Sequence, residues 1–414
     1  MPNKDRNIPK RRFKEFENED AWELRKLGEL AEIVRGASPR PIQDPKWFDE
    51  QSEIGWLRIS DVTEQDGRIY HLEQKISKLG QQKTRVLVEP HLLLSIAATV
   101  GKPVVNYVKT GVHDGFLIFL EPRFEQEFMF QWLEMFRSSW SKYGQPGSQV
   151  NLNSDLVKNQ ELSIPTHPEQ EAIGTFFSTL DQQITLHQRK LDKLKHVKQA
   201  YLSEMFPAEG ERVPKRRFPG FTDDWELRKL GEVSSHRGGT AIENFFSEDG
   251  KYKVISIGSY GLDNKYVDQN IRAVENEVTR LRVVNKNELT MVLNDKTANG
   301  NIIGRCLLIE TDDEFVINQR TEIINFDNEV NPKFAYVVLN GVFREQVKKI
   351  VQGGTQIYVN YSSVEQLSFS LPTLPEQKAI GTFFSTLDRQ ITLHQRKLEK
   401  LKNLKKALLN ELFV

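Results

Sequence analysis

The chain has 414 residues, and its 57 lysine and arginine residues balance 57 aspartate and glutamate residues, so the formal net charge is zero. This length predicts two or three domains. The single cysteine, Cys306, excludes a disulfide framework and a cysteine-rich metal site and fits a reducing compartment. No apolar run could span a bilayer and the first residues lack the apolar core of a signal peptide, so we expect a cytoplasmic protein without membrane contact.

Two short motifs open the chain and return in its second half. PKRRF occupies residues 9–13 and 214–218, and WELRKLGE occupies residues 22–29 and 225–232. A period of about two hundred residues indicates a duplicated domain rather than a solenoid. The join after Phe206 is polar and contains Pro and Gly, as expected of a linker.

The bodies that follow these motifs share little sequence, but both mix short β-rich runs with one amphipathic helix. In the first body we expect strands at 56–59, 86–88, 92–96, 104–105 and 116–120 and a helix at 126–140. In the second we expect strands at 254–257, 289–293, 306–309 and 321–324 and a helix from Pro332 to about Val351.

A polar loop closes each body at the same offset. GSQVNL spans residues 147–152, and GTQIYV spans residues 354–359. Backbone amides, a hydroxyl and a side-chain amide suit contacts to phosphates or base edges. An ordinary turn with side-chain caps explains the pattern equally well.

Each half ends in a long helical stretch, at residues 168–206 and 375–413. The two stretches are identical at 30 of 39 positions. Their apolar residues alternate in spacings of three and four over about five heptads, which predicts a coiled coil. Two polar pairs, His187 with His394 and Lys198 with Lys405, interrupt the seam at equivalent positions. With no second ligand nearby, these positions are more typical of residues that fix register than of a metal site.

Catalytic motifs are absent: there is no phosphate-binding P-loop, no nucleophile elbow and no zinc-protease helix. Residues 331–334 (NPKF) partly resemble the Asn-Pro-Pro-aromatic motif of adenine methyltransferases, but they lack the second proline and are typical of a helix start. Residues 376–378 (EQK) resemble a nuclease Glu-x-Lys, but the equivalent residues 169–171 break it. The pattern favours a binding protein with two different heads on one duplicated helical frame, with no catalytic and no metal-ligating residues.

This doubled layout resembles the specificity subunit of type I restriction-modification systems over nearly the whole chain. Residues 214–221 and 225–232 resemble the family's opening, the two long stretches its conserved regions, and the bodies its target recognition domains. The first opening departs from this form by two extra residues before Trp22. The resemblance implies an α+β fold: two α/β target recognition domains in pseudo-two-fold arrangement, each followed by a long helix, with the helices pairing as an antiparallel coiled coil. The domains would be 1–166, 167–206, 207–373 and 374–414.

The resemblance also implies a function. The chain would be a non-catalytic subunit that reads a bipartite, asymmetric sequence in double-stranded DNA, one half with each recognition domain. Its helices would act as a spacer and dock two methyltransferase subunits, which bind S-adenosylmethionine. Restriction subunits with ATP- and Mg-dependent translocase and nuclease activity would join them, so this chain would bind no cofactor itself.

Candidate DNA contacts are chosen by chemistry alone, as donors and acceptors expected in loops or at strand ends. They are Arg58, Ser60, Lys83, Arg85, Thr99, Lys102, Ser148, Gln149 and Asn151 in the first body, and Asn294, Lys296, Asn299, Asn301, Arg305, Gln319, Arg320, Thr355, Gln356 and Tyr358 in the second. Two other functions compete: a coiled-coil structural adaptor that does not bind DNA, and a single-chain nuclease or methyltransferase with a degenerate motif.

Overall fold

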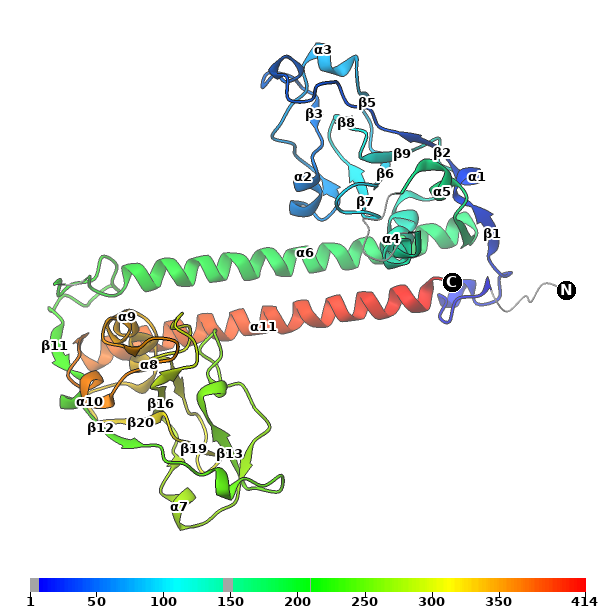
Figure 1. The fold of residues 1–414 in the computed structure, drawn as a ribbon. Helices are drawn as coiled ribbons and strands as arrows, with labels where there is room; N and C mark the ends of the chain where they lie inside the picture. Colours follow the sequence, from blue (N-terminus) through cyan, green and yellow to red (C-terminus); the bar gives the residue numbers. More distant parts are fainter. Residues whose placement is uncertain (1–6, 144–151, 209) are drawn as a thin grey trace. The chain divides into compact units, whose positions relative to one another are not determined.

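The computed structural model describes residues 7–143, 152–208 and 210–414 and divides into two compact units. The first unit consists of Met1–Gln188 with Arg396–Val414, and the second of Arg189–Gln395. Each unit therefore contains one α/β head and a part of both long helices, α6 and α11 (Figure 1). The predicted sequential division, by contrast, assigned each helix to a separate domain.

The head of the first unit is built on a five-stranded and a three-stranded sheet, in the orders β2-β9-β6-β7-β4 and β3-β8-β5. A third, two-stranded sheet pairs β1 with β10. The strands are β1 (Glu23–Lys26), β2 (Glu32–Arg35), β3 (Gly55–Trp56), β4 (Arg68–Ile69), β5 (Arg85–Leu87), β6 (Leu92–Ser95), β7 (Pro103–Asn106), β8 (Thr110–Val112), β9 (Phe116–Leu120) and β10 (Glu161–Ile164). The helices are α1 (Leu27–Leu30), α2 (Ile59–Glu64), α3 (Lys78–Gln81), α4 (Gln126–Phe136) and α5 (Ser154–Lys158), with 3-10 turns η2 (Lys14–Phe16), η3 (Pro45–Trp47) and η4 (Arg137–Tyr143).

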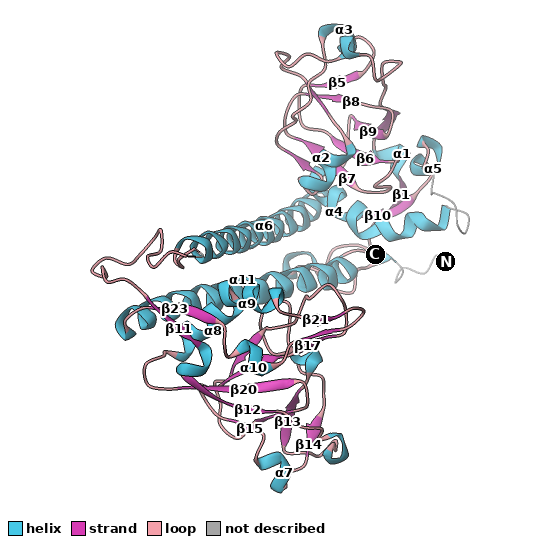
Figure 2. Cartoon of the chain, turned by 60° about the vertical axis from the view of Figure 1, so that its left-hand side comes forward, coloured by secondary structure: helices cyan, strands magenta, loops and turns pink. Residues whose placement is uncertain are grey.

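The head of the second unit repeats this plan with sheets in the orders β12-β20-β16-β18 and β14-β13-β19-β15, the pair β11-β23, and an added sheet β17-β22-β21 (Figure 2). The strands are β11 (Glu226–Lys229), β12 (Ser234–Gly238), β13 (Tyr252–Ile255), β14 (Arg272–Ala273), β15 (Val283–Val284), β16 (Leu289–Val292), β17 (Asn294–Asp295), β18 (Cys306–Leu308), β19 (Phe315–Ile317), β20 (Thr321–Phe326), β21 (Gln352–Gly353), β22 (Ile357–Tyr358) and β23 (Ser368–Leu371). The helices are α7 (Glu277–Arg280), α8 (Pro332–Asn340), α9 (Val342–Lys349) and α10 (Tyr361–Val364), with 3-10 turns η5 (Leu230–Glu232), η6 (Glu243–Phe245) and η7 (Ile257–Ser259).

Most predicted strands are confirmed, but two predicted elements are wrong. The strand expected at 56–59 stops at Trp56, because the Asp61 carboxylate accepts the Arg58 amide at 2.8 Å and starts α2 there. The helix expected from Pro332 to about Val351 is broken into α8 and α9 at Gly341, whose ψ of −117° is far from helical.

The start of each long helix is held by a buried carboxylate. In α6 (His167–Glu204), Glu169 is fully buried and accepts two hydrogen bonds from the Arg12 guanidinium, both at 2.7 Å. In α11 (Leu374–Leu412), Glu376 accepts the same pair from Arg217, at 2.6 and 2.7 Å. The two repeated motifs, PKRRF and Pro-Glu-Gln, are therefore the two sides of one contact that occurs once in each unit.

The two long helices also pack against each other in antiparallel fashion within each unit. In the first unit, Lys405 Nζ lies 2.6 Å from Asp181 Oδ1, and the rings of Phe177 and Phe413 stack. In the second, Lys198 Nζ lies 2.6 Å from Asp388 Oδ1. Asp181 and Asp388 occupy equivalent positions in the two repeats, as do Lys198 and Lys405. The lysines predicted to fix the register of the helices thus make the polar contacts across their seam.

An exchange of charges across the second pair tests this contact. We expect Asp388→Lys or Lys198→Asp alone to lower the free energy of unfolding of the second unit by about 1–3 kcal/mol, because each leaves two like charges on a seam where the side chains are only 25% and 26% exposed. The double variant restores attraction and should recover most of the loss in differential scanning calorimetry.

Lys190→Asp changes the same charge on the exposed face of α6 and should have little effect. Equal destabilisation by the double variant and by the sum of the two single variants would show that the pair does not interact in solution.

Candidate functional site

Sheet topology gathers several polar loops at one end of each head. In the first unit, β2 and β6 end where the antiparallel strands β9 and β7 begin. In the second unit, β12 and β16 end where β20 and β18 begin. We call this end of each head the loop edge. Because connecting loops are exposed and free to vary, such an edge is where a recognition surface is expected.

The first unit brings together the described candidates at or beside its loop edge. Thr99 and Lys102 lie in the turn between β6 and β7, and Arg85 pairs in register with Val112, next to the turn between β8 and β9. The Arg85 guanidinium donates to the Arg35 carbonyl at 2.8 Å. Lys83 and Ser60 are exposed, in the segment before β5 and in α2 respectively. Ser148, Gln149 and Asn151 lie outside the described residues.

Two of these candidates are already neutralised by neighbouring carboxylates. Lys102 is only 11% exposed and lies 2.6 Å from both Asp66 and Glu134. Arg58 donates to Asp61 at 2.8 Å and lies 3.4 Å from Glu73. A cation held in this way has less to give to a phosphate than an exposed one, so the free chain presents Lys83 and Arg85 more readily than Lys102.

The second unit arranges its candidates around the small sheet β17-β22-β21. Asn294 pairs in register with Tyr358, and the Arg320 guanidinium approaches the Asn294 side-chain oxygen at 3.5 Å. Thr355 and Gln356 lie exposed in the turn between β21 and β22. The predicted loop GTQIYV thus forms a hairpin beside the loop edge and is not an isolated turn.

The loop from Asp295 to Gly304 contains three more candidates, and two buried side chains hydrogen-bond to its backbone. The Asp295 carboxylate accepts the backbone amides of Thr297 at 2.9 Å and Ile302 at 2.8 Å. Burial raises the pKa of Asp295, but these amides outweigh burial and the net pKa is lower than usual. The buried Arg344 donates to the carbonyls of Ile303, Gly300 and Asn301.

This support leaves the polar side chains of the loop free to face outward. Lys296, Asn299 and Asn301 are exposed. Arg305 is half-buried and instead bonds within the head, to the Asn301 carbonyl and the Asn264 side chain. Gln319 is exposed but donates to Glu243 at 3.0 Å. The arrangement offers amide donors and acceptors on a stiff loop, which is what base edges require.

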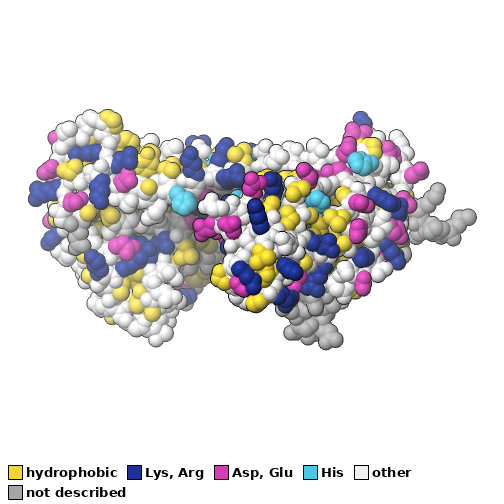
Figure 3. All heavy atoms as spheres, turned by 90° about the horizontal axis from the view of Figure 1, so that it is seen from above, with side chains coloured by type: hydrophobic (Ala, Val, Ile, Leu, Met, Phe, Trp, Pro, Cys, Tyr) yellow, Lys and Arg dark blue, Asp and Glu magenta, His cyan; other side chains and the backbone are white. Residues whose placement is uncertain are grey.

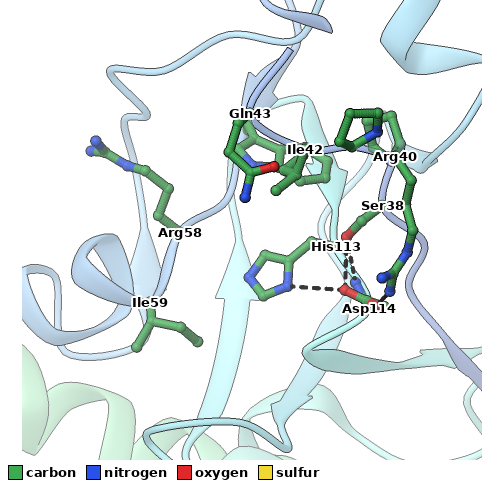
Figure 4. Close-up of a pocket in the computed structure, with 11 residues that line it drawn as sticks. Ser38, Arg40, Ile42, Gln43, Arg58, Ile59, His113 and Asp114 are labelled. Atoms are coloured by element: carbon green, nitrogen blue, oxygen red, sulfur yellow. Dashed lines mark hydrogen bonds and ion pairs between the residues drawn. The ribbon is translucent and has the colours of Figure 1, made fainter.

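Sequence reasoning missed the loop that follows β2. Residues 38–43 line a pocket of about 610 Å³ together with Trp56, Arg58, His113 and Asp114. In Figure 4, His113 points into this pocket, and dashed lines join Asp114 to Ser38, Arg40 and His113. The only signal in the sequence is a short polar run, SPRPIQ, which resembles any other surface loop.

The His113 ring is a neutral donor at this position. Burial lowers the pKa of His113, so the uncharged form is favoured at neutral pH. Its Nδ1 atom accepts the backbone amide of Gly115 at 2.9 Å. The proton of the neutral ring therefore lies on Nε2.

On the face that Figure 3 displays, positive charge does not gather in one patch. Figure 3 shows Lys and Arg side chains interspersed with Asp and Glu over the displayed face, in keeping with a formal net charge of zero. Electrostatic attraction to an acidic ligand must therefore come from local groups such as those at the loop edges.

The residues considered above for catalysis have structural roles. Asn331 caps α8 by accepting the amides of Lys333 and Phe334. Glu376 is held by Arg217, and the Gln377 side chain accepts the Asn331 amide. Within the described part of the chain, no cluster of three or more His, Cys, Asp or Glu side chains is placed to hold a metal, and no helix is long and apolar enough to cross a membrane.

Comparison with known proteins agrees with the doubled layout. A family model described as the type I restriction modification DNA specificity domain matches residues 19–196 and again residues 222–403. The type I restriction enzyme MjaVIII specificity subunit of Methanocaldococcus jannaschii is 22% identical over 402 residues, covering 94% of this chain and 91% of that protein. The putative type I restriction enzyme MjaX specificity subunit of the same organism is 21% identical over 427 residues, covering 94% and 92%.

A solved structure shares the fold. The crystal structure of the S subunit of a type I restriction-modification system from M. genitalium superposes with a TM-score of 0.66, covering 98% of this chain and 99% of that chain. Its sequence identity is 13%, so this likeness concerns the fold alone. Together with the sheets and helices described above, it confirms the predicted α+β architecture of two heads and two long helices.

Removal of the Asp295 carboxylate should loosen the second unit's loop. We expect Asp295→Ala to leave the amides of Thr297 and Ile302 without their acceptor, at a cost of about 1–3 kcal/mol, and to speed hydrogen exchange of residues 296–302. Because the pKa of Asp295 is lowered in the folded chain, its contribution is present above the ordinary aspartate range and should be lost as the pH falls through the lowered pKa.

Asp249→Ala is the matched control, since Asp249 is an exposed carboxylate of the same unit in the segment before β13. Unchanged exchange of residues 296–302 in Asp295→Ala would contradict the proposed support of the loop.

Proposed function

The chain belongs to the family of type I restriction modification DNA specificity domains, and from this premise we propose that it reads a two-part, asymmetric DNA sequence, one half with each loop edge. The chain is the specificity component of such a system and not an enzyme. The observation that carries the proposal is that two heads with one sheet plan bear different side chains on equivalent loops. One plan with two sets of donors and acceptors is what two different half-sites require.

The DNA-reading surface that we propose makes two kinds of contact, one to phosphates and one to base edges. Exposed cations such as Lys83 and Lys296 would contact phosphates, which position the duplex without reading it. Amide side chains such as Asn299 and Gln356 would contact base edges. Since the total charge is zero, part of the electrostatic attraction would come from partner subunits.

The partners follow from the family and are proposals for this chain. Two methyltransferase subunits would dock on the duplicated frame and bring S-adenosylmethionine, and restriction subunits would add the ATP- and Mg-dependent steps. The repetition of PKRRF, WELRKLGE and the long helix in both halves supports a partner that binds twice. We place the site of action in the cytoplasm, where such a complex meets DNA.

An adaptor that does not bind DNA accounts for the long helices but not for the loop edges. It gives no reason for a buried aspartate and a buried arginine to hold an exposed Lys- and Asn-bearing loop in one conformation. DNA reading gives a reason for this support, because a preorganised loop loses less entropy on binding.

Exchange of one body tests the proposed function. Replacement of residues 233–371 by the equivalent body of a relative should change one half of the methylated motif and leave the other half and the gap unchanged, because the two heads lie in separate compact units. The motif would be mapped by genome-wide detection of methylated adenine in cells that carry the chain with its methyltransferase partner.

The same mapping provides its own controls. Cells with the methyltransferase alone should show no specific motif, and purified chain alone should not transfer methyl groups from S-adenosylmethionine to DNA. Loss of both half-sites together, or a motif that ignores the exchanged body, would sink the proposal.

A single side chain of the second unit tests the mode of reading. If Gln356 makes a bidentate base contact, Gln356→Ala should lower affinity for the target by about 1–3 kcal/mol and relax one position of one half-site. Gln366→Ala is the control, because Gln366 is an exposed glutamine that bonds Lys229 away from the loop edge. Equal weakening on every DNA sequence in a fluorescence binding assay would indicate a phosphate contact instead.

A further inference from the structure

The pocket loop of the first unit is an insertion relative to the second. Twelve positions separate Gly36, whose amide bonds the Phe116 carbonyl, from Phe48, which bridges Ile76. Only seven separate the equivalent Gly239, bonded to Thr321, from Phe246, which bridges Ala273. The five additional residues fall within the segment that contains the pocket-lining residues 38–43.

One side chain of this loop is both exposed and oriented. The Arg40 side chain is 81% exposed, yet its Nη2 atom donates to the Asp114 carboxylate at 2.9 Å. Asp114 is itself held by the Ser38 hydroxyl at 2.7 Å. Burial raises the pKa of Asp114, but Ser38, Arg35 and Arg40 outweigh it and keep the carboxylate ionised.

The hydrogen bond to Asp114 uses one of the N–H donors of the Arg40 guanidinium and leaves others available. A guanidinium has five N–H donors, and in the described part of the chain Asp114 is the partner recorded for that of Arg40. A free Arg side chain on a surface samples many rotamers, and fixing it costs free energy on binding. A carboxylate that fixes it beforehand reduces that cost.

Other arginine side chains also lie in this part of the first unit. The Arg35 guanidinium donates to the Asp114 carbonyl at 2.6 Å, and the Arg85 guanidinium donates to the Arg35 carbonyl. The Arg35 and Arg40 guanidinium groups thus both contact Asp114, and two cations against one carboxylate leave local positive charge for a polyanion. The pocket beside them offers the Nε2 donor of His113 and the side-chain amide of Gln43.

The second unit has the opposite chemistry at the equivalent turn. There the Glu243 carboxylate accepts from the side chains of Asn318 and Gln319, at 2.9 and 3.0 Å. Those hydrogen bonds, led by that of Asn318, lower the pKa of Glu243. The turn that presents a guanidinium in one head therefore presents a carboxylate in the other.

We propose that Arg40, held by Asp114 on the inserted loop, is a specificity-determining residue of the first unit and reads a guanine of its half-site through the O6 and N7 acceptors. This proposal rests on the proposed function. Guanine is the base whose major-groove edge offers two acceptors to a guanidinium fork, whereas cytosine and adenine present amino donors there. A phosphate could accept the same two donors but would carry no sequence information, and the experiment separates the two cases on that ground.

The experiment uses the full chain with its methyltransferase partner and a library of duplexes randomised at each position of the wild-type motif. Arg40→Ala removes the fork, and Arg40→Lys keeps the charge without the two parallel donors. Arg123→Ala is the matched control, because Arg123 is an exposed arginine of the same head that lies beyond the opposite end of β9. Thermal melting checks that each variant is folded.

We expect Arg40→Ala to lose preference for guanine at one position of one half-site by about 5- to 150-fold, the range of one bidentate contact, and Arg40→Lys to lose part of that preference. Arg123→Ala should keep the wild-type motif. An unchanged motif in Arg40→Ala, or an equal loss of methylation on all sequences, overturns the assignment to a base contact. The proposed function fails separately, if the wild-type complex itself marks no two-part motif.

Discussion

The structure depends on one buried ion pair in each half. Glu169 and Glu376 are fully buried at the starts of the long helices and are paired with Arg12 and Arg217. Removal of one partner from such a pair leaves an uncompensated buried charge, which costs about 3–5 kcal/mol. The pair therefore fixes where the opening segment of each half meets its long helix.

The neighbouring glutamine extends this junction to the head. Gln170 accepts the Glu125 amide at the start of α4 and donates to the Pro165 carbonyl after β10. Gln377 makes the equivalent bonds to Asn331 and Pro372. One dipeptide on each helix thus holds the head helix and the last strand, and these hydrogen bonds do not involve the loop edges.

The two loop edges show how similar sheets can present different side chains for recognition. The first unit has a longer loop after β2 that presents Arg40 against Asp114, and the second has a shorter one that presents Glu243. The second unit also has the loop held by Asp295 and Arg344. Each loop is stiffened by hydrogen bonds from within its own head, so changes in exposed side chains need not disturb the sheets.

The sequence by itself determined the duplication, the family resemblance and the two long helices, because these depend on local periodicity and on motifs repeated at one offset. It also predicted that the seam lysines, Lys198 and Lys405, fix the register of the helices, and the structure pairs them with Asp388 and Asp181. Only the tertiary structure decided which candidate cations are exposed, since Lys102 is neutralised by Asp66 and Glu134 from distant parts of the chain. The same holds for Arg40, because the carboxylate that orients it lies 74 positions away and is brought close only by the pairing of the strands.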